Sequence, residues 1–168
     1  MLTPMHAKAL KALNRRRVRF VLIGGFAIRA HGVPRAPHDL DLWIEPTPDN
    51  AQRVAAALST ISKADPHAVR ERASAPGNRI VVPREDAPEV DLLTSIGDLD
   101  FSMVHAAARI AHLDGQPVRL PTREHLIATK HIAIAEMRKQ LAPGAPIPEH
   151  LQRDIDRDER DIVLLLQS

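Results

Sequence analysis

Hydrophobic positions along this chain fall into short runs and longer periodic stretches, which together indicate a protein built from both strands and helices. Apolar runs bounded by glycine, proline or charged residues predict strands at 18–23, 40–44, 79–82 and 90–93, with a short strand near 118–120. Helical spacing and capping residues predict helices after Thr3, at 26–31, from 48 to about 61, from 101 to 108, from 122 to about 141, and beyond 150. The fold class expected from this order is mixed α/β (α+β), with helices gathered at the C-terminal end.

Two C-terminal helices are predicted from their apolar faces and from the segment between them. The stretch Pro143-Gly144-Ala145-Pro146 is typical of a helix break. Beyond it, one face of a last helix carries four apolar residues: Leu151, Ile155, Ile162 and Leu166. We expect a single domain over residues 1–168, with a core at about 18–120 and C-terminal helices at about 122–167.

Composition narrows the classes of function. With 168 residues and a formal net charge of +2, the chain has the size of one soluble domain. It contains no cysteine, which excludes disulfides, thiol catalysis and cysteine-ligated metals. Its longest apolar stretch is far shorter than the roughly 20 residues of a membrane span, and no apolar segment of signal-peptide length follows the basic N-terminal residues. We therefore expect a cytoplasmic protein with no membrane partner.

Three aspartates on two predicted strands are the strongest chemical signal. Asp39 and Asp41 are two residues apart, so on a strand their side chains leave the same face about 7 Å apart along the backbone. Asp91 has similar surroundings on a later strand, between Val90 and Leu92, which should point into the core. Carboxylates held together favour a divalent cation between them, and their hard oxygen atoms suit Mg²⁺ or Mn²⁺. The alternative is a pair of amphipathic strands with a solvated acidic face.

Gly24-Gly25 lies between the first predicted strand and a short predicted helix. Glycine lets the backbone approach a ligand closely, and exposed N–H groups at the start of a helix attract anions such as phosphate. Alone, such a pair more often marks a simple turn. Its position just ahead of two carboxylates is what makes a phosphate site the more interesting interpretation.

A basic cluster precedes these motifs. No acidic residue occurs before Asp39, and the segment ahead of the first strand is rich in lysine and arginine: Lys8, Lys11, Arg15, Arg16, Arg17 and Arg19. The cluster could attract phosphates, or it could simply be the solvated end of a helix, where positive charge is favoured.

The order and spacing of the glycines and carboxylates resemble the motif of the DNA polymerase β-type nucleotidyltransferase superfamily. Ile23-Gly24-Gly25 is followed after 13 residues by Asp39-Leu40-Asp41-Leu42, and Asp91 stands where the third carboxylate of the superfamily is expected. Finer features are similar to the small prokaryotic branch that includes AbiE-type toxin nucleotidyltransferases: Gly24-Gly25-Phe26-Ala27, His31-Gly32 and Arg35 to Asp41. One position departs, because Pro37 replaces the usual threonine and removes a hydroxyl from that loop. The resemblance implies a small mixed sheet of the nucleotidyltransferase type flanked by helices.

Two later elements also follow from the resemblance. Lys130 matches a lysine on a following helix, and the run from Arg157 to Asp161 resembles a late acidic element. Lys130 lies in line with an apolar stripe, so the position of its ammonium group needs a reason. It either pairs with a carboxylate or extends to solvent, or, as we favour, it neutralises a bound triphosphate. Asp158 and Asp161 are interpreted as helix surface charge or as an ion pair to the rest of the domain.

The activity implied by the resemblance is a Mg²⁺-dependent transfer of a nucleoside monophosphate from an NTP to a hydroxyl acceptor, with release of pyrophosphate. The metal ions, for which Mn²⁺ is a second possibility, would be held by the catalytic residues Asp39, Asp41 and Asp91. The nucleotide would be bound by Gly24, Gly25, Arg35 and Lys130. The acceptor would be a tRNA or a small hydroxylated molecule, and a toxin of this kind would have an antitoxin partner. Two alternatives are a catalytically inactive protein of the same fold with a binding or regulatory role, and a basic RNA-binding adaptor.

Overall fold

The computed structural model describes residues 1–82, 90–141 and 146–168. The predicted loop after residue 82 and most of the predicted helix break at 143–146 therefore lie outside the described residues. The elements follow one another in the order α1 (Pro4–Arg15), β1 (Phe20–Leu22), α2 (Gly24–Ala30), β2 (Leu40–Ile44), α3 (Pro48–Leu58), α4 (Pro66–Ala73), β3 (Arg79–Val82), β4 (Val90–Leu93), α5 (Phe101–Ala107), β5 (Arg109–Leu113), β6 (Gln116–Leu120), α6 (Arg123–Lys139) and α7 (Glu149–Gln167).

A four-stranded mixed sheet forms the centre of the molecule. Its strand order is β1-β2-β4-β3, with β2 and β4 parallel and the two outer pairs antiparallel. A separate hairpin of β5 and β6 lies beside β1. The predicted fold class, a small mixed sheet flanked by helices, is confirmed.

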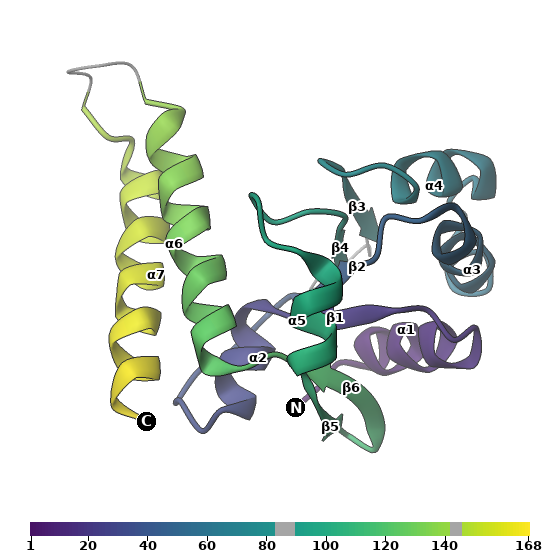
Figure 1. The fold of residues 1–168 in the computed structure, drawn as a ribbon, viewed down its shortest axis with the longest axis horizontal. Helices are drawn as coiled ribbons and strands as arrows, with labels where there is room; N and C mark the ends of the chain where they lie inside the picture. Colours follow the sequence, from purple (N-terminus) through teal and green to yellow (C-terminus); the bar gives the residue numbers. More distant parts are fainter. Residues whose placement is uncertain (83–89, 142–145) are drawn as a thin grey trace.

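The sheet is covered on both faces (Figure 1). Apolar side chains on one face, including Leu40 and Leu42, join the main core together with α1 and α3. On the other face, Val21 and Trp43 pack with Phe101 of α5, and the rings of Trp43 and Phe101 meet edge to face at 5.3 Å. Because strand side chains alternate, the residues between the core positions of β2 and β4 emerge on the α5 face.

Helices α6 and α7 form an antiparallel pair that stands beside the sheet (Figure 1). Their contact is a small apolar cluster centred on Ile134, Ile155 and Ile162. The predicted apolar face of the last helix is therefore correct at Ile155 and Ile162. It is wrong at Leu166, which is 70% exposed, because the preceding Leu165 turns inward instead.

Several capping predictions are confirmed by hydrogen bonds. Thr3 caps α1 by accepting from the His6 N–H, and Thr122 caps α6 by accepting from the His125 N–H. Two elements were not predicted, although both have sequence signals. Asp65 and Pro66 begin α4 as N-cap and first residue, and Asp114-Gly115, both with positive φ, make the turn that pairs β5 with β6.

None of the described helices is long and apolar enough to cross a membrane.

Candidate active site

Two of the three predicted carboxylates lie on neighbouring strands at the same height. Strands β2 and β4 are parallel, and their register pairs Asp41 with Asp91. Their chain neighbours Leu40, Leu42 and Leu92 are fully buried in the main core, so the alternation expected from the sequence is correct. Both carboxylates therefore emerge on the α5 face, and Asp91 is only 6% exposed.

Asp39 is placed differently. It lies in the bend just before β2 and is exposed, while still close enough to Asp41 to act on it electrostatically. Within residues 1–82, 90–141 and 146–168, no group of three or more histidine, cysteine or acidic side chains is close enough to hold a metal ion. The fold thus brings Asp41 and Asp91 together, and leaves Asp39 at the edge of the pair.

Gly24, the first residue of the glycine pair, packs directly against Asp41. Gly24 has a φ of 63°, and a Cβ added to it would lie 2.0 Å from Oδ2 of Asp41. A Cβ on Gly25 would lie 2.9 Å from the Cβ of Pro37. A side chain at either position would displace its neighbour, so Gly24 is required by its close approach to the carboxylate and Gly25 by its close approach to Pro37. They are also the first two residues of α2, whereas the sequence predicted a helix that begins after them.

Asp41 occupies an unfavourable electrostatic environment. Burial, followed by the nearby charges of Asp91 and Asp39, raises the pKa of Asp41 from 3.8 to about 7, against the opposing effect of Lys130 and Arg79. Close to it, the buried Oδ1 of Asp91 accepts no hydrogen bond from any described residue. Crowded, incompletely paired carboxylate oxygens are the donor set that a hard divalent cation prefers. The residues present therefore fit Mg²⁺ or Mn²⁺.

Arg79 is a charged residue at this site that the sequence did not single out. It begins β3, which pairs with β4, and its Nη2 lies 2.5 Å from Oδ2 of Asp91. No motif pointed to it, because the contact depends on β3 pairing antiparallel with β4. The alternating pattern of 79–82 predicted the strand but not its neighbour.

Lys130 projects from α6 toward α7 and is buried in an ion-pair cluster. Its Nζ lies 2.6 Å from Oδ1 of Asp158 and 3.1 Å from Oδ2 of Asp161. Asp161 also lies 3.5 Å from Nε of Arg35, whose side chain sits close to Gly25. The pairing of Lys130 with carboxylates, the less favoured of the two sequence interpretations, is thus what the structure shows. For Asp158 and Asp161, the ion pair is correct and surface charge is wrong, since both are at most 5% exposed.

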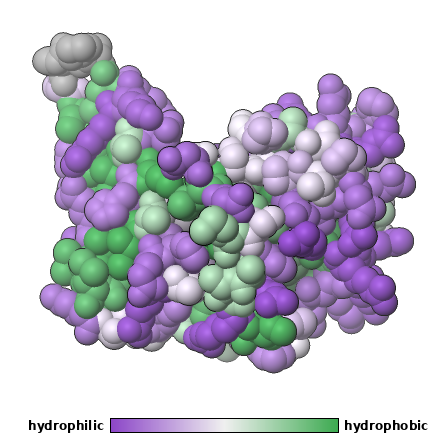
Figure 2. Space-filling model, in the orientation of Figure 1, coloured by the Kyte–Doolittle hydropathy of each residue, from purple (hydrophilic) through white to green (hydrophobic). Residues whose placement is uncertain are grey.

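A cleft of about 610 Å³ separates these two groups of charges. One side, here called the sheet wall, comprises Gly24, Asp41 and Arg79 with the adjacent Asp91. The opposite side, the helix wall, comprises Lys130, Asp158 and Arg157 of the helix pair. Figure 2 shows the surface hollowed between the helix pair and the rest of the molecule. A cleft with carboxylates on one wall and a lysine on the other is suited to bind a metal–phosphate complex.

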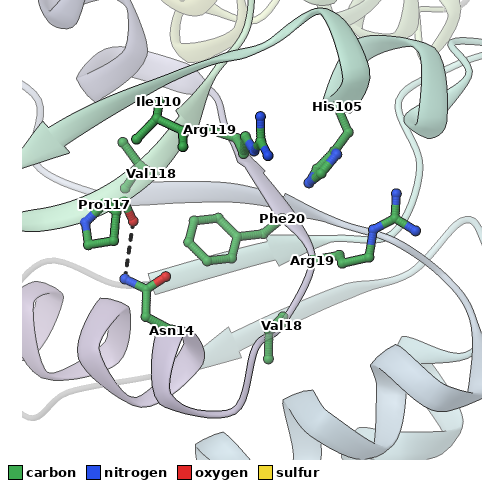
Figure 3. Close-up of a pocket in the computed structure, with 9 residues that line it drawn as sticks. All are labelled: Asn14, Val18, Arg19, Phe20, His105, Ile110, Pro117, Val118 and Arg119. Atoms are coloured by element: carbon green, nitrogen blue, oxygen red, sulfur yellow. Dashed lines mark hydrogen bonds between the residues drawn. The ribbon is translucent and has the colours of Figure 1, made fainter.

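A smaller hollow of about 180 Å³ has the opposite character (Figure 3). Its floor is apolar, with Phe20, and the side chains of Arg19, His105 and Arg119 surround its opening. Burial and the two arginines lower the pKa of His105. None of the residues lining this hollow is a carboxylate, so it lacks the charged oxygen donors that Mg²⁺ or Mn²⁺ prefers. The catalytic candidates lie in the cleft.

A known protein family matches most of the chain. The model of the family "Nucleotidyl transferase AbiEii toxin, Type IV TA system" matches residues 8–167. The chain belongs to the AbiEii nucleotidyltransferase family. The predicted relationship to DNA polymerase β-type nucleotidyltransferases, and to their AbiE-type toxin branch, is confirmed. The chain is accordingly a nucleotidyltransferase of a family of toxins from toxin–antitoxin systems.

A solved structure with a TM-score above 0.5 resembles this AbiEii family member in fold. The solution structure of the antibiotic-resistance factor ANT(2'')-Ia has a TM-score of 0.52 and 16% identity, over 96% of this chain and 86% of that chain. A crystal structure of ANT(2")-Ia in complex with adenylyl-2"-tobramycin has a TM-score of 0.46 and 14% identity, over 96% of this chain and 92% of that chain. No curated protein matches the chain.

Proposed function

We propose that this AbiEii family member transfers a nucleoside monophosphate from an NTP to a hydroxyl acceptor. The observation that carries the proposal is the register of β2 and β4, which sets Asp41 beside Asp91, with Gly24 pressed against the Asp41 carboxylate. The acceptor oxygen would form a bond to the α-phosphorus, the bond from that phosphorus to pyrophosphate would break, and the acceptor hydroxyl would lose its proton. Catalysis would rest on positioning and electrostatic stabilisation, with no covalent enzyme intermediate.

The three carboxylates would have different roles in this reaction. Asp41 and Asp91, with Asp39 at the edge, would hold Mg²⁺ or Mn²⁺, which would lower the charge on the triphosphate and make the acceptor oxygen a better nucleophile. Asp91 is the most buried carboxylate of the sheet wall, with one oxygen that no described residue bonds. It is therefore the candidate to receive the acceptor proton, while Asp41 and Asp39 face the phosphates.

The triphosphate would lie along the cleft between the two walls. Gly24 and Gly25 would contact it through their backbone, since neither position has room for a side chain. Lys130 lines the cleft and is near enough to Asp41 to influence its charge. Asp158 and Asp161 would fix the direction of the Lys130 ammonium, and Arg35 would contribute positive charge beside Gly25.

Among acceptors, a tRNA is better supported than a small hydroxylated molecule. The basic cluster of the N-terminal segment is exposed at Arg15, Arg16, Arg17 and Arg19. Arg19 and Arg119 continue this positive surface around the hollow of Figure 3. Surfaces of this kind bind the phosphate backbone of nucleic acids. An antitoxin partner is proposed from the family alone.

The test is transfer of label from α-phosphate-labelled NTPs, with Mg²⁺, to pooled tRNA and separately to small hydroxylated antibiotics. We expect labelled tRNA with the wild type and none with Asp41→Asn. Equal labelling by the two proteins would remove Asp41 from the mechanism. Mn²⁺-dependent binding of a non-hydrolysable NTP, without transfer to any acceptor, would instead favour the binding or regulatory alternative. Salt-sensitive RNA binding that survives Asp41→Asn, with no nucleotide binding, would favour the RNA adaptor.

A further inference from the structure

The hollow of Figure 3 brings nitrogen-bearing side chains from different elements to one opening. Arg19 directly precedes β1, Arg119 belongs to β6, and His105 lies in the last turn of α5. None of the described residues that line the hollow is acidic. The carboxylate of Glu45, outside this lining, lies 2.9 Å from Nη1 of Arg19 and offsets one of the arginine charges. The opening therefore keeps an excess of positive charge.

Hydrogen bonds hold the edge of the hollow in place. The buried Asn50 fixes the backbone of Arg19, because its Oδ1 accepts from the Arg19 N–H at 2.8 Å and its Nδ2 donates to the Arg19 carbonyl at 3.0 Å. The Nη1 of Arg119 donates to the carbonyl of Ala108 at 3.2 Å. A guanidinium group has several N–H donors, so either arginine can also donate to a ligand. Groups that are already positioned lose less conformational entropy on binding.

His105 lies in surroundings that favour an anion beside it. Its ring stacks on Phe101 at 5.5 Å, and the guanidinium of Arg19 lies 5.9 Å from the centre of the same Phe101 ring. Burial, followed by the charges of Arg19 and Arg119, lowers the pKa of His105 and so favours its neutral ring. A phosphate between the two arginines would offset their charge and accept a hydrogen bond from the His105 ring.

The floor of the hollow is apolar and aromatic. Phe20 and Val118 belong to it and are at most 4% exposed, whereas Ile110 at its edge is 60% exposed. Asn14 closes one side, because its Nδ2 donates to the Pro117 carbonyl at 3.1 Å, the bond drawn in Figure 3. Cationic groups beside an aromatic surface are the combination with which proteins bind single-stranded nucleic acid.

We propose that this hollow is a subsite for one nucleotide of the acceptor RNA. Arg19, Arg119 and His105 bind its phosphate. Its base or ribose packs against the floor at Phe20. The proposal rests on the part of the proposed function that makes RNA the acceptor, and it adds a discrete site to the general attraction of the basic cluster. The hollow lies at the other end of β1 from Gly24, about 13 Å away at the rise of a strand, so RNA with its end in the cleft is held at a second point.

The test is the affinity of the whole protein for pooled tRNA, measured by filter binding at low salt without NTP. Arg119→Gln should weaken binding about tenfold, because it removes a charged hydrogen-bond donor from a fixed phosphate site. Arg16→Gln removes an equal charge from the basic cluster and should weaken binding by less than about threefold. Arg138→Gln is the control, since Arg138 is 58% exposed on α6 and does not line the hollow. Its affinity for tRNA should equal that of the wild type.

Ile110→Glu tests the hollow with both arginines in place. Because Ile110 is exposed, the variant should fold, and the added carboxylate would repel a phosphate at the opening. We expect tRNA binding to weaken about tenfold or more. The ring signals of His105 in NMR spectra give a local measurement. The pKa of His105 should rise when tRNA binds to the wild type, since the phosphate offsets the arginine charges.

The outcomes separate this proposal from the proposed function. If Arg119→Gln and Ile110→Glu bind tRNA as tightly as Arg138→Gln, the subsite is overturned, while label transfer by the wild type would leave the proposed function standing. If the wild type binds tRNA through the hollow but binds no NTP with Mn²⁺, the proposed function is overturned and the subsite stands. If inorganic phosphate shifts the His105 signals and tRNA does not, the RNA assignment is overturned. Circular dichroism establishes that each variant is folded, and should Arg119→Gln fail to fold, Ile110→Glu decides by the same comparison.

Discussion

The two walls of the cleft carry their charges in opposite ways. On the helix wall, a buried lysine lies between two buried aspartates, with Nζ to carboxylate distances of 2.6 and 3.1 Å. On the sheet wall, two aspartates face one another in register, and the only described cation paired with them by a salt bridge is Arg79, which is half exposed. Arg157 and Arg35 add positive charge, at 3.9 Å from Asp158 and 3.5 Å from Asp161, so the helix wall is balanced within the protein. The sheet wall is left with an excess of negative charge.

This difference indicates that the charges of the helix wall stabilise the fold, whereas the charges of the sheet wall serve ligand binding and catalysis. A balanced buried cluster fixes the position of its members, and breaking it leaves an uncompensated charge. An unbalanced cluster costs stability, which is reasonable only where a ligand supplies the missing charge. We therefore expect substitutions on the sheet wall to affect activity most, and substitutions on the helix wall to affect stability most.

The largest effect is expected from Asp41→Asn. Loss of this carboxylate should lower the rate of nucleotidyl transfer by about 1,000-fold or more, since it removes a charge that would position the metal and the triphosphate. The rate of label transfer under saturating NTP measures the effect. Asp49→Asn is the control, because it removes a carboxylate that lies on the surface of α3, 79% exposed. Asp49→Asn should keep full activity, and comparable losses in the two variants would contradict a special role for the sheet wall.

The second-largest effect is expected on the stability of the protein, from a substitution in the helix wall. Lys130→Met should lower the free energy of unfolding by about 3 to 5 kcal/mol, because the buried Asp158 and Asp161 lose the cation that lies closest to both of them. Denaturant unfolding measures it. Lys139→Met is the matched control, since Lys139 pairs with Glu136 on the exposed face of α6 and should change stability by less than about 0.5 kcal/mol. Equal stability of the two variants would show that the buried cluster does not hold α7 in place.

The excess negative charge of the sheet wall also predicts a pH dependence. The pKa of Asp41 is raised to about 7 in the folded protein, from 3.8, so its protonated form is favoured on folding. The metal-free protein should therefore lose stability as the pH rises from 3.8 through about 7. Between about pH 5 and about pH 8, the wild type should lose about 2 kcal/mol relative to Asp41→Asn. Thermal unfolding of both proteins at the two pH values measures this loss of stability. Parallel pH profiles of the wild type and Asp41→Asn would contradict the raised pKa of Asp41.

The smallest effect on activity and stability is expected from a substitution in the turn that contains Gly24 and Gly25. Gly24→Ala would place a methyl group 2.0 Å from the Asp41 carboxylate, so we expect the transfer rate to fall about tenfold and stability by about 1 to 2 kcal/mol. Gly32→Ala is the control, since Gly32 also has a positive φ, of 89°, but no neighbour within 4 Å. It should lower stability by about 1 kcal/mol and leave activity unchanged. Equal activity of the two variants would show that the contact with Asp41 is unimportant.

Much of this arrangement follows from local sequence signals. The core positions around Asp41 and Asp91 alternate as strands do, and the bounds predicted for β2, β3 and β4 agree with the structure because proline, glycine and charged residues flank them. What the sequence could not supply is which strands pair. The Arg79–Asp91 contact depends on β3 lying next to β4, and such long-range pairing leaves no periodic signal.

The contacts of the helix wall also depend on residues that are far apart in the sequence, so the sequence alone does not predict them. Lys130 was recognised as a cation in an apolar stripe, but its partners lie on α7, 28 and 31 residues further along the chain. Asp158 and Asp161 are three residues apart and share one face of a helix, which from the sequence is equally typical of solvated charge. The inward turn of α7 at Leu165 rather than Leu166 is set by packing against the body of the protein, which the periodicity of one helix does not specify.

The central claim is that Asp41 and Asp91 together hold a divalent ion at the sheet wall. Anomalous diffraction at the manganese edge, from crystals grown with Mn²⁺ and a non-hydrolysable NTP, locates the ion directly. We predict an anomalous peak in contact with both carboxylates, with the triphosphate beside Gly24. A bound nucleotide whose Mn²⁺ contacts neither Asp41 nor Asp91 would contradict the claim.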